Sequence, residues 1–142
     1  MFKVLMLVFS AATTVSVAAQ ELQIFDTAVR QPLPGRTVSV GYLSIKNTRP
    51  EAVRLIKASS PLFGSIELHQ HSMVNGMMQM QRMQDIEIPA GQTIKLQPGG
   101  LHLMMFRPVA PLELNGSVPI ELSFSDGTSQ RYESLVVPVP KQ

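Results

Sequence analysis

Turn-forming residues divide this chain into short stretches, and this spacing constrains the fold more than any other feature. Prolines and glycines at 32–35, 47–50, 89–91 and 98–100 interrupt the apolar stretches. Proline lacks the donor that a strand ladder requires, and no window of helical length shows 3.6-residue periodicity. The pattern predicts an all-β Greek-key sandwich or barrel of about nine short strands. They are expected at residues 22–29, 37–45, 52–58, 66–73, 77–83, 93–96, 101–106, 118–124 and 130–137, with a short further segment at 85–88.

The first 19 residues have the features of a signal peptide. Lys3 gives a positive start, residues 4–17 are apolar, and Val17-Ala18-Ala19 offers small residues to a signal peptidase. We expect cleavage after Ala19, a single domain at 20–142, and export to a bacterial periplasm. A retained membrane anchor is the alternative, but the apolar run is shorter than the roughly 20 residues that span a bilayer. The lack of a lipobox cysteine argues against a lipoprotein.

Length, charge and cysteine content narrow the class of protein further. The chain has 142 residues, no cysteine and a formal net charge of +2. This length suits one domain with a real core. The nearly balanced charge gives no basic stripe, so we expect no nucleic-acid partner. Without cysteine the exported fold must rest on core packing, and a thiolate copper site of the blue-copper type is excluded.

Histidine and methionine are confined to one window of the mature chain. All three histidines and every methionine beyond the leader lie between Glu67 and Arg107. Thioether sulfur combined with imidazole favours Cu(I) over hard cations, so this segregation predicts a copper site. The donors available in the window are His69, His71, Met73, Met77, Met78, Met80, Met83, His102, Met104 and Met105.

The Asn75-Gly76 dipeptide predicts how part of this window folds. Asn-Gly suits a two-residue type I′ turn, in which both central residues need positive φ. Such a turn would place His71 directly opposite Met80. Side chains alternate faces along a strand. One face of the hairpin would therefore carry His69, His71, Met73, Met78, Met80 and Arg82, with Ile66 and Leu68 on the face toward the core.

The stretch 101–106 follows the same alternation. His102, Met104 and Phe106 would form one face, and the opposite face would be apolar, with Leu101, Leu103 and Met105. A His-x-Met pair on a strand puts both donors on one side, about 7 Å apart. Four or five donors from the two segments are therefore expected to meet on an outer surface of the sandwich.

Several methionines have an alternative, non-ligand interpretation. Met77, Met83 and Met105 are expected to pack, because methionine fills irregular gaps in a core. Met73 and Met78 are either ligands or shields of the site. An exposed methionine-rich patch would also suit an adaptable protein-binding surface.

The spacing of these donors resembles the motif of the periplasmic copper chaperones called PCu(A)C. That motif is a histidine, ten residues, a methionine, twenty-one residues, and then His-x-Met. Here Met80 follows His69 after ten residues, and His102-Leu-Met104 follows after twenty-one more. The surroundings are also similar, at residues 42–47, 58–61, 66–69, 78–80, 88–91 and 98–104, so the resemblance extends over essentially the whole mature chain.

The resemblance implies a fold, a ligand set and a role. It implies a cupredoxin-like β-sandwich that binds Cu(I) through His69, Met80, His102 and Met104, and that delivers copper toward respiratory oxidase assembly. The partners would be a copper-accepting oxidase subunit or another copper chaperone. One departure is His71, which stands where relatives usually have methionine. We hypothesise that His71 enters the site or replaces His69, and so raises the tolerance of Cu(II).

The leading interpretation is therefore a copper carrier that is not an enzyme, with no stable membrane insertion after cleavage of the leader. The main alternative is an exported β-sandwich module that docks a protein or peptide on its methionine-rich face. The absence of cysteine argues against an electron-transfer cupredoxin. No carboxylate pair or serine motif indicates a hydrolase. The sequence leaves the oligomeric state open.

Overall fold

The computed structural model describes residue 12 and residues 21–140 of the chain. The expected signal peptide and its cleavage site lie outside the described residues, apart from Ala12. Over the described residues the chain forms ten strands and no helix, which confirms the all-β class. No helix there is long and apolar enough to cross a membrane. The strands are β1 Gln23–Arg30, β2 Val38–Lys46, β3 Val53–Ser59, β4 Phe63–Val74, β5 Met77–Met83, β6 Ile86–Ile88, β7 Thr93–Leu96, β8 Leu101–Pro108, β9 Ser117–Phe124 and β10 Ser129–Val137.

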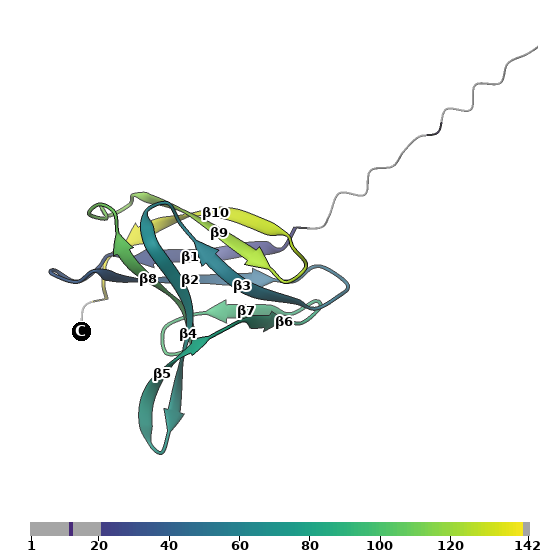
Figure 1. Cartoon of the computed structure of the whole chain (residues 1–142), viewed down its shortest axis with the longest axis horizontal. Coiled ribbons are helices and arrows are strands. Elements are labelled where there is room, and N and C mark those ends of the chain that lie inside the picture. The colour runs from purple at the N-terminus through teal and green to yellow at the C-terminus, as the bar shows by residue number, and fades with distance from the viewer. Residues whose placement is uncertain (1–11, 13–20, 141–142) are drawn as a thin grey trace, which may run out of the picture.

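The ten strands form one mixed sheet that folds over a shared core. Their order is β5-β4-β8-β7-β2-β1-β10-β9-β3-β6, and β8 also pairs with β2. Most neighbours are antiparallel, but β1 runs parallel to β10 and β7 runs parallel to β8. β10 pairs with β9 through most of its length and with β1 at its end, so it joins the two halves of the sandwich (Figure 1).

The core lies between these two halves and is mainly aliphatic. β3 and β4 are consecutive strands joined by a short connection and contact each other, although they are far apart in the sheet order. Apolar residues at alternate positions of β2, β8 and β9 point into the core, as a half-buried strand requires. The largest fully buried side chains are Phe124, Leu22, Leu43, Ile45, Leu55, Ile88, Leu103, Met105, Ile120, Leu122, Val29 and Val118.

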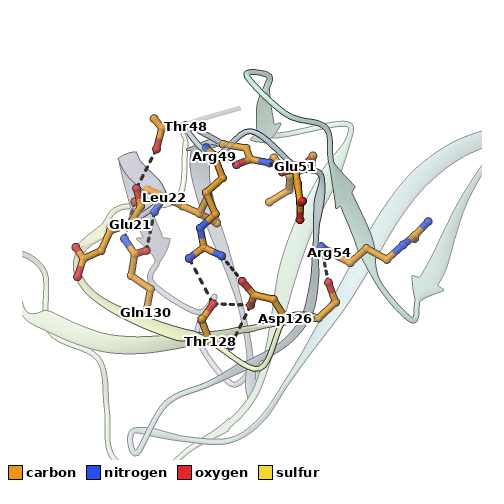
Figure 2. Close-up of polar contacts among 12 residues, drawn as sticks. Glu21, Leu22, Thr48, Arg49, Glu51, Arg54, Asp126, Thr128 and Gln130 are labelled. Atoms are coloured by element: carbon orange, nitrogen blue, oxygen red, sulfur yellow. Dashed lines mark hydrogen bonds and ion pairs between the residues drawn. The ribbon is translucent and has the colours of Figure 1, made fainter. Parts of the chain in front are cut away.

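Polar contacts close one end of the sandwich. The Arg49 guanidinium pairs with Asp126 and also donates to Thr128, which connects the β2–β3 loop to the β9–β10 turn (Figure 2). The backbone of Leu22 exchanges two hydrogen bonds with the Gln130 side chain, of 3.1 and 2.6 Å. These contacts tie the start of β1 and the β2–β3 loop to the terminal hairpin.

The β4–β5 hairpin extends away from the body of the domain (Figure 1). β5 is one of the two terminal strands of the sheet, and within the described part of the chain it pairs with β4 alone. β4 continues into the body, where it pairs with β8 from Phe63 to Gln70. The hairpin therefore joins an exposed tip to a strand that lies on the core.

Candidate metal centre

Three adjacent strands bring the predicted donors together. His69 on β4 pairs directly with His102 on β8. On the other side of β4, His71 pairs with Met80 on β5. Met104 lies two residues after His102, on the same face of β8 by strand alternation. The predicted donors therefore occupy neighbouring positions on one side of the β5-β4-β8 sheet. They are His69, His71, Met80, His102 and Met104.

The hairpin register agrees with the turn predicted from the sequence. Asn75 and Gly76 have φ values of 51° and 76°, as a type I′ turn requires. The seven pairs from Val74↔Met77 to Leu68↔Met83 follow without a shift. The turn thus fixes which side chain of β5 lies beside each side chain of β4, and it places Met80 next to the imidazoles.

The imidazole ring of His102 lies close enough to each of its two imidazole neighbours for that pair of rings to share one ion. The ring centroids of His71 and His102 are 4.8 Å apart, and those of His69 and His102 are 5.8 Å apart. A metal about 2.0 Å from one nitrogen of each ring would separate two centroids by about 4.4 Å at a right angle and about 6.3 Å in line. Both observed separations fall within this range.

His102 presents one buried nitrogen without a hydrogen-bond partner. Its Nδ1 lies 3.1 Å from the carbonyl oxygen of Gly100. A carbonyl can only accept, so Nδ1 carries the proton and Nε2 keeps its lone pair. Nε2 is buried and has no hydrogen-bond partner among the residues that the structure describes. Because buried polar atoms are normally paired, this atom is available to a ligand that the protein itself does not supply.

His69 has the same arrangement with its two nitrogens exchanged. Its Nε2 lies 2.8 Å from Oε2 of Glu67, and its Nδ1 is buried without a partner. In the neutral ring Nε2 donates to the carboxylate, which leaves the Nδ1 lone pair free. Metal-ligating histidines generally donate their second nitrogen to a carboxylate or carbonyl in this way. Two imidazoles of this centre therefore have the arrangement of metal ligands.

Electrostatic effects favour neutral histidine and charged carboxylate here. Burial lowers the pKa of His102, and the nearby His71 and His69 rings lower it further, against the opposing effect of the Gly100 hydrogen bond. The hydrogen bond from His69 holds the pKa of the Glu67 carboxyl below its ordinary value, with Arg82 and Arg107 acting in the same direction. His102 thus keeps the neutral form that metal ligation requires.

The expectation that every donor lies on an outer surface is wrong for His102. Its exposed fraction is 3 %, whereas Met80 is 48 % exposed. His102 is on β8, which is flanked by β4 on one side and by β7 and β2 on the other, and the rings of His69 and His71 lie against it. The centre therefore runs from an exposed thioether inward to a covered imidazole.

The remaining methionines divide into packing and exposed residues. Met105 is fully buried and Met83 packs against the core, as predicted. The prediction that Met77 also packs is wrong, because 67 % of it is exposed. The side chain of Met77 points to the opposite face of β5 from that of Met80. At the tip of the hairpin, however, neither face of β5 packs on the core. Met73 and Met78 are also exposed.

Methionine sulfur is the further donor type on this face beside the two imidazoles. Over residues 12 and 21–140, no group of three or more His, Cys, Asp or Glu side chains is arranged to hold a metal ion. The two unpartnered nitrogens of His69 and His102 are the prepared donors. Met80 and Met104 are the sulfur donors on the same face nearest to them in register.

Sequence reasoning missed Glu67 as a member of this centre. Glu67 pairs with Met104 across β4 and β8, and its second oxygen lies 3.5 Å from Arg82 on β5. The pattern Glu-x-His on a strand places a carboxylate beside an imidazole on one face, and this was the available indication. Glu67 therefore connects all three strands of the site.

Comparison with known proteins identifies the family. The model of the family "LpqE-like: Putative lipoprotein LpqE-like" matches residues 22–139. The "Putative lipoprotein Lxx21020" of Leifsonia xyli subsp. xyli is 33 % identical over 131 residues, covering 92 % of this chain and 76 % of that protein. The chain belongs to the LpqE-like family, and its membership indicates export to the cell envelope.

Solved structures with the same fold are PCuAC domains. The copper-bound PCuAC domain from PmoF2 superposes with a TM-score of 0.71 at 21 % identity, covering 86 % of this chain and 97 % of that domain. The Cu(I) form of DR1885 from Deinococcus radiodurans gives a TM-score of 0.59 at 27 % identity, covering 83 % and 80 %. The expected similarity to the PCu(A)C family is confirmed for the fold.

Proposed function

We propose that this protein is a copper carrier that binds Cu(I) through His69, Met80, His102 and Met104. The observation that carries the proposal is the pair of buried, unpartnered nitrogens, Nδ1 of His69 and Nε2 of His102. Each lies on a ring whose other nitrogen already has an acceptor. Two neutral imidazoles and two thioethers form a soft, uncharged ligand set, which suits the monovalent ion better than Zn(II) or Fe(II).

Carriage fits this arrangement better than catalysis. Met80 is exposed on a terminal strand, so a partner's ligand can approach the ion from that side and replace the protein's donors one at a time. The DR1885 structure is of a Cu(I) form, and the PmoF2 structure is of a copper-bound domain. Both support copper as the cargo. We propose a periplasmic carrier that delivers to a copper-accepting oxidase subunit or to another copper chaperone.

The test is an anaerobic Cu(I) competition against a chromogenic chelator. The wild-type protein is expected to withdraw one tightly bound equivalent, and His102→Ala/Met104→Ala to withdraw much less. Met104→Leu tests the sulfur with little change of volume, which separates loss of a ligand from loss of the fold. Met83→Leu is the matched control, because Met83 packs on the core. Equal copper withdrawal by all four proteins would contradict the proposal.

X-ray absorption of the copper-loaded protein gives an independent check. The proposed set predicts two nitrogen and two sulfur neighbours around Cu(I). If His71 enters the site, the nitrogen number rises and Cu(II) is better tolerated. The alternative function is a protein-binding module that uses the exposed methionines, and it predicts no copper-dependent change in any of these variants.

A further inference from the structure

The tip of the β4–β5 hairpin carries a second pair of thioethers. Met73 and Met78 are directly opposite each other across the hairpin, two pairs beyond His71 and Met80 toward the turn, with the Ser72–Gln79 pair between them. By strand alternation these four side chains lie on the same face. The pair therefore continues the line of donors outward, along the part of the hairpin that extends from the body (Figure 1).

Packing does not account for these two methionines. Met73 and Met78 are 65 % and 60 % exposed, and neither contributes to the core. Residues directly opposite in an antiparallel pair have Cβ atoms about 5 Å apart, and the methionine side chain has three rotatable bonds. Two such side chains can bring their sulfurs onto one soft ion without moving the backbone.

The donors change in a consistent order along the hairpin. At the tip they are exposed thioethers, next comes the pair His71 and Met80, and innermost is the covered imidazole of His102. An ion that enters at the tip can exchange one ligand at a time, because the two donor pairs of the hairpin are two residues apart along each strand, about 7 Å. The innermost donors are the most enclosed and the most prepared to bind.

We propose that Met73 and Met78 form a second, outer Cu(I) site that loads the inner site. The ion arrives as Cu(I), and each copper–sulfur bond that breaks is replaced by a bond to the next donor, with no change of oxidation state. The outer site binds more weakly than the inner one, because it offers two exposed thioethers and no prepared imidazole. This inference rests on the proposed function, since the outer pair acts through the inner site.

The test is an anaerobic Cu(I) titration followed by the methyl signals of 13C-labelled methionine. In the wild type the first equivalent is expected to shift Met80 and Met104, and the second to shift Met73 and Met78. Met73→Leu/Met78→Leu should lose the second equivalent, keep the affinity of the first, and take up copper from a chelator more slowly. Leucine keeps the size and apolar character of methionine but removes the sulfur.

The chain provides a matched control for this variant. Met77 is as exposed as Met73 but has the opposite parity on the hairpin, so Met77→Leu should leave both equivalents and the uptake rate unchanged. The outer site would be overturned if the double variant still bound the second equivalent of Cu(I). It would also be overturned if Met77→Leu lost that equivalent to the same extent. If copper shifts Met73 and Met78 of the wild type but does not shift Met80 and Met104, the inner site is overturned and the outer pair is retained.

Discussion

Nε2 of His69 lies 2.8 Å from Oε2 of Glu67, two residues earlier on the same strand. The other oxygen of Glu67 lies 3.5 Å from Arg82, which is two residues after Met80 on β5. One carboxylate thus fixes the ring orientation of a proposed ligand and holds the strand that supplies another. It also places a negative charge beside a site whose proposed ligands are all neutral.

Replacing Glu67 should weaken copper binding without removing a ligand. We expect Glu67→Leu to lower the Cu(I) affinity by about 10- to 100-fold, the usual cost of losing a hydrogen-bond partner of a metal ligand. Glu67→Gln keeps an acceptor oxygen and should lose less. The measurement is Cu(I) competition, together with 15N shifts of the His69 ring in the metal-free protein. An unchanged tautomer and affinity in Glu67→Leu would contradict a positioning role.

Copper affinity should fall as the pH is lowered. Ligation needs neutral imidazole, so protonation competes with the metal by up to about tenfold per pH unit for each ring. Because burial holds the pKa of His102 below its ordinary value, His102 begins to contribute this loss only below about pH 6.5. Competition assays from pH 5 to 8 measure the profile. A flat profile would count against imidazole ligation.

The register of the hairpin could be predicted because it depends on local residues. The Asn75-Gly76 turn fixes the pair next to it, and strand alternation then sets every later pair up to Leu68 and Met83. The apolar residues at alternate positions, Leu103 and Met105, likewise identified the face of β8 that packs on the core. These features need only the turn chemistry and the period of a strand.

The pairing of His69 with His102 could not be predicted in the same way. It joins segments separated by more than thirty residues, and their spacing alone does not specify which strand lies beside β4. The burial of His102 follows from its place on β8, an interior strand of the sheet, where the rings of His69 and His71 lie against it. The exposure of Met77 has the opposite cause, because the hairpin extends beyond the core and leaves both of its faces uncovered (Figure 1).

Asn47 should be important for stability although it lies outside the site. Its side chain is fully buried and donates to the carbonyls of Glu51 and Ile88, at 2.8 and 2.9 Å, while its oxygen accepts from the amide of Arg49. Asn47→Ala leaves these three groups without their partner. We expect a loss of about 1–3 kcal/mol in the free energy of unfolding, the usual cost of leaving a buried group unsatisfied, because the hydrogen bond to Ile88 is buried and the other two are partly buried.

Urea unfolding measures this loss, and Thr48→Ala is the control. The Thr48 hydroxyl makes one exposed hydrogen bond, to the carbonyl of Glu21, so its removal should change stability by no more than about 0.5 kcal/mol. The folded fraction of Asn47→Ala should bind Cu(I) as the wild type does. A loss of stability as small as that of Thr48→Ala would show that other residues hold this loop.

The turn of the hairpin should affect both stability and copper binding. Gly76 has a φ of 76°, and a Cβ added there would meet no atom within 4 Å. The cost of Gly76→Ala is therefore conformational, about 1 kcal/mol, because an L-residue disfavours this region. The cost falls on β5, which pairs with β4 alone within the described residues. We expect faster amide exchange over residues 77–83 and a lower Cu(I) affinity, since Met80 is held by this pairing.

Gly127 provides the matched control for this effect. It has a φ of 84°, it also has open space at the Cβ position, and it lies in the β9–β10 turn outside the site. Gly127→Ala should destabilise the protein to a similar degree while leaving the Cu(I) affinity unchanged. If the two alanine variants bind copper equally well, the hairpin does not position Met80 as a ligand. If only Gly76→Ala binds weakly, the geometry of the turn contributes directly to the metal site.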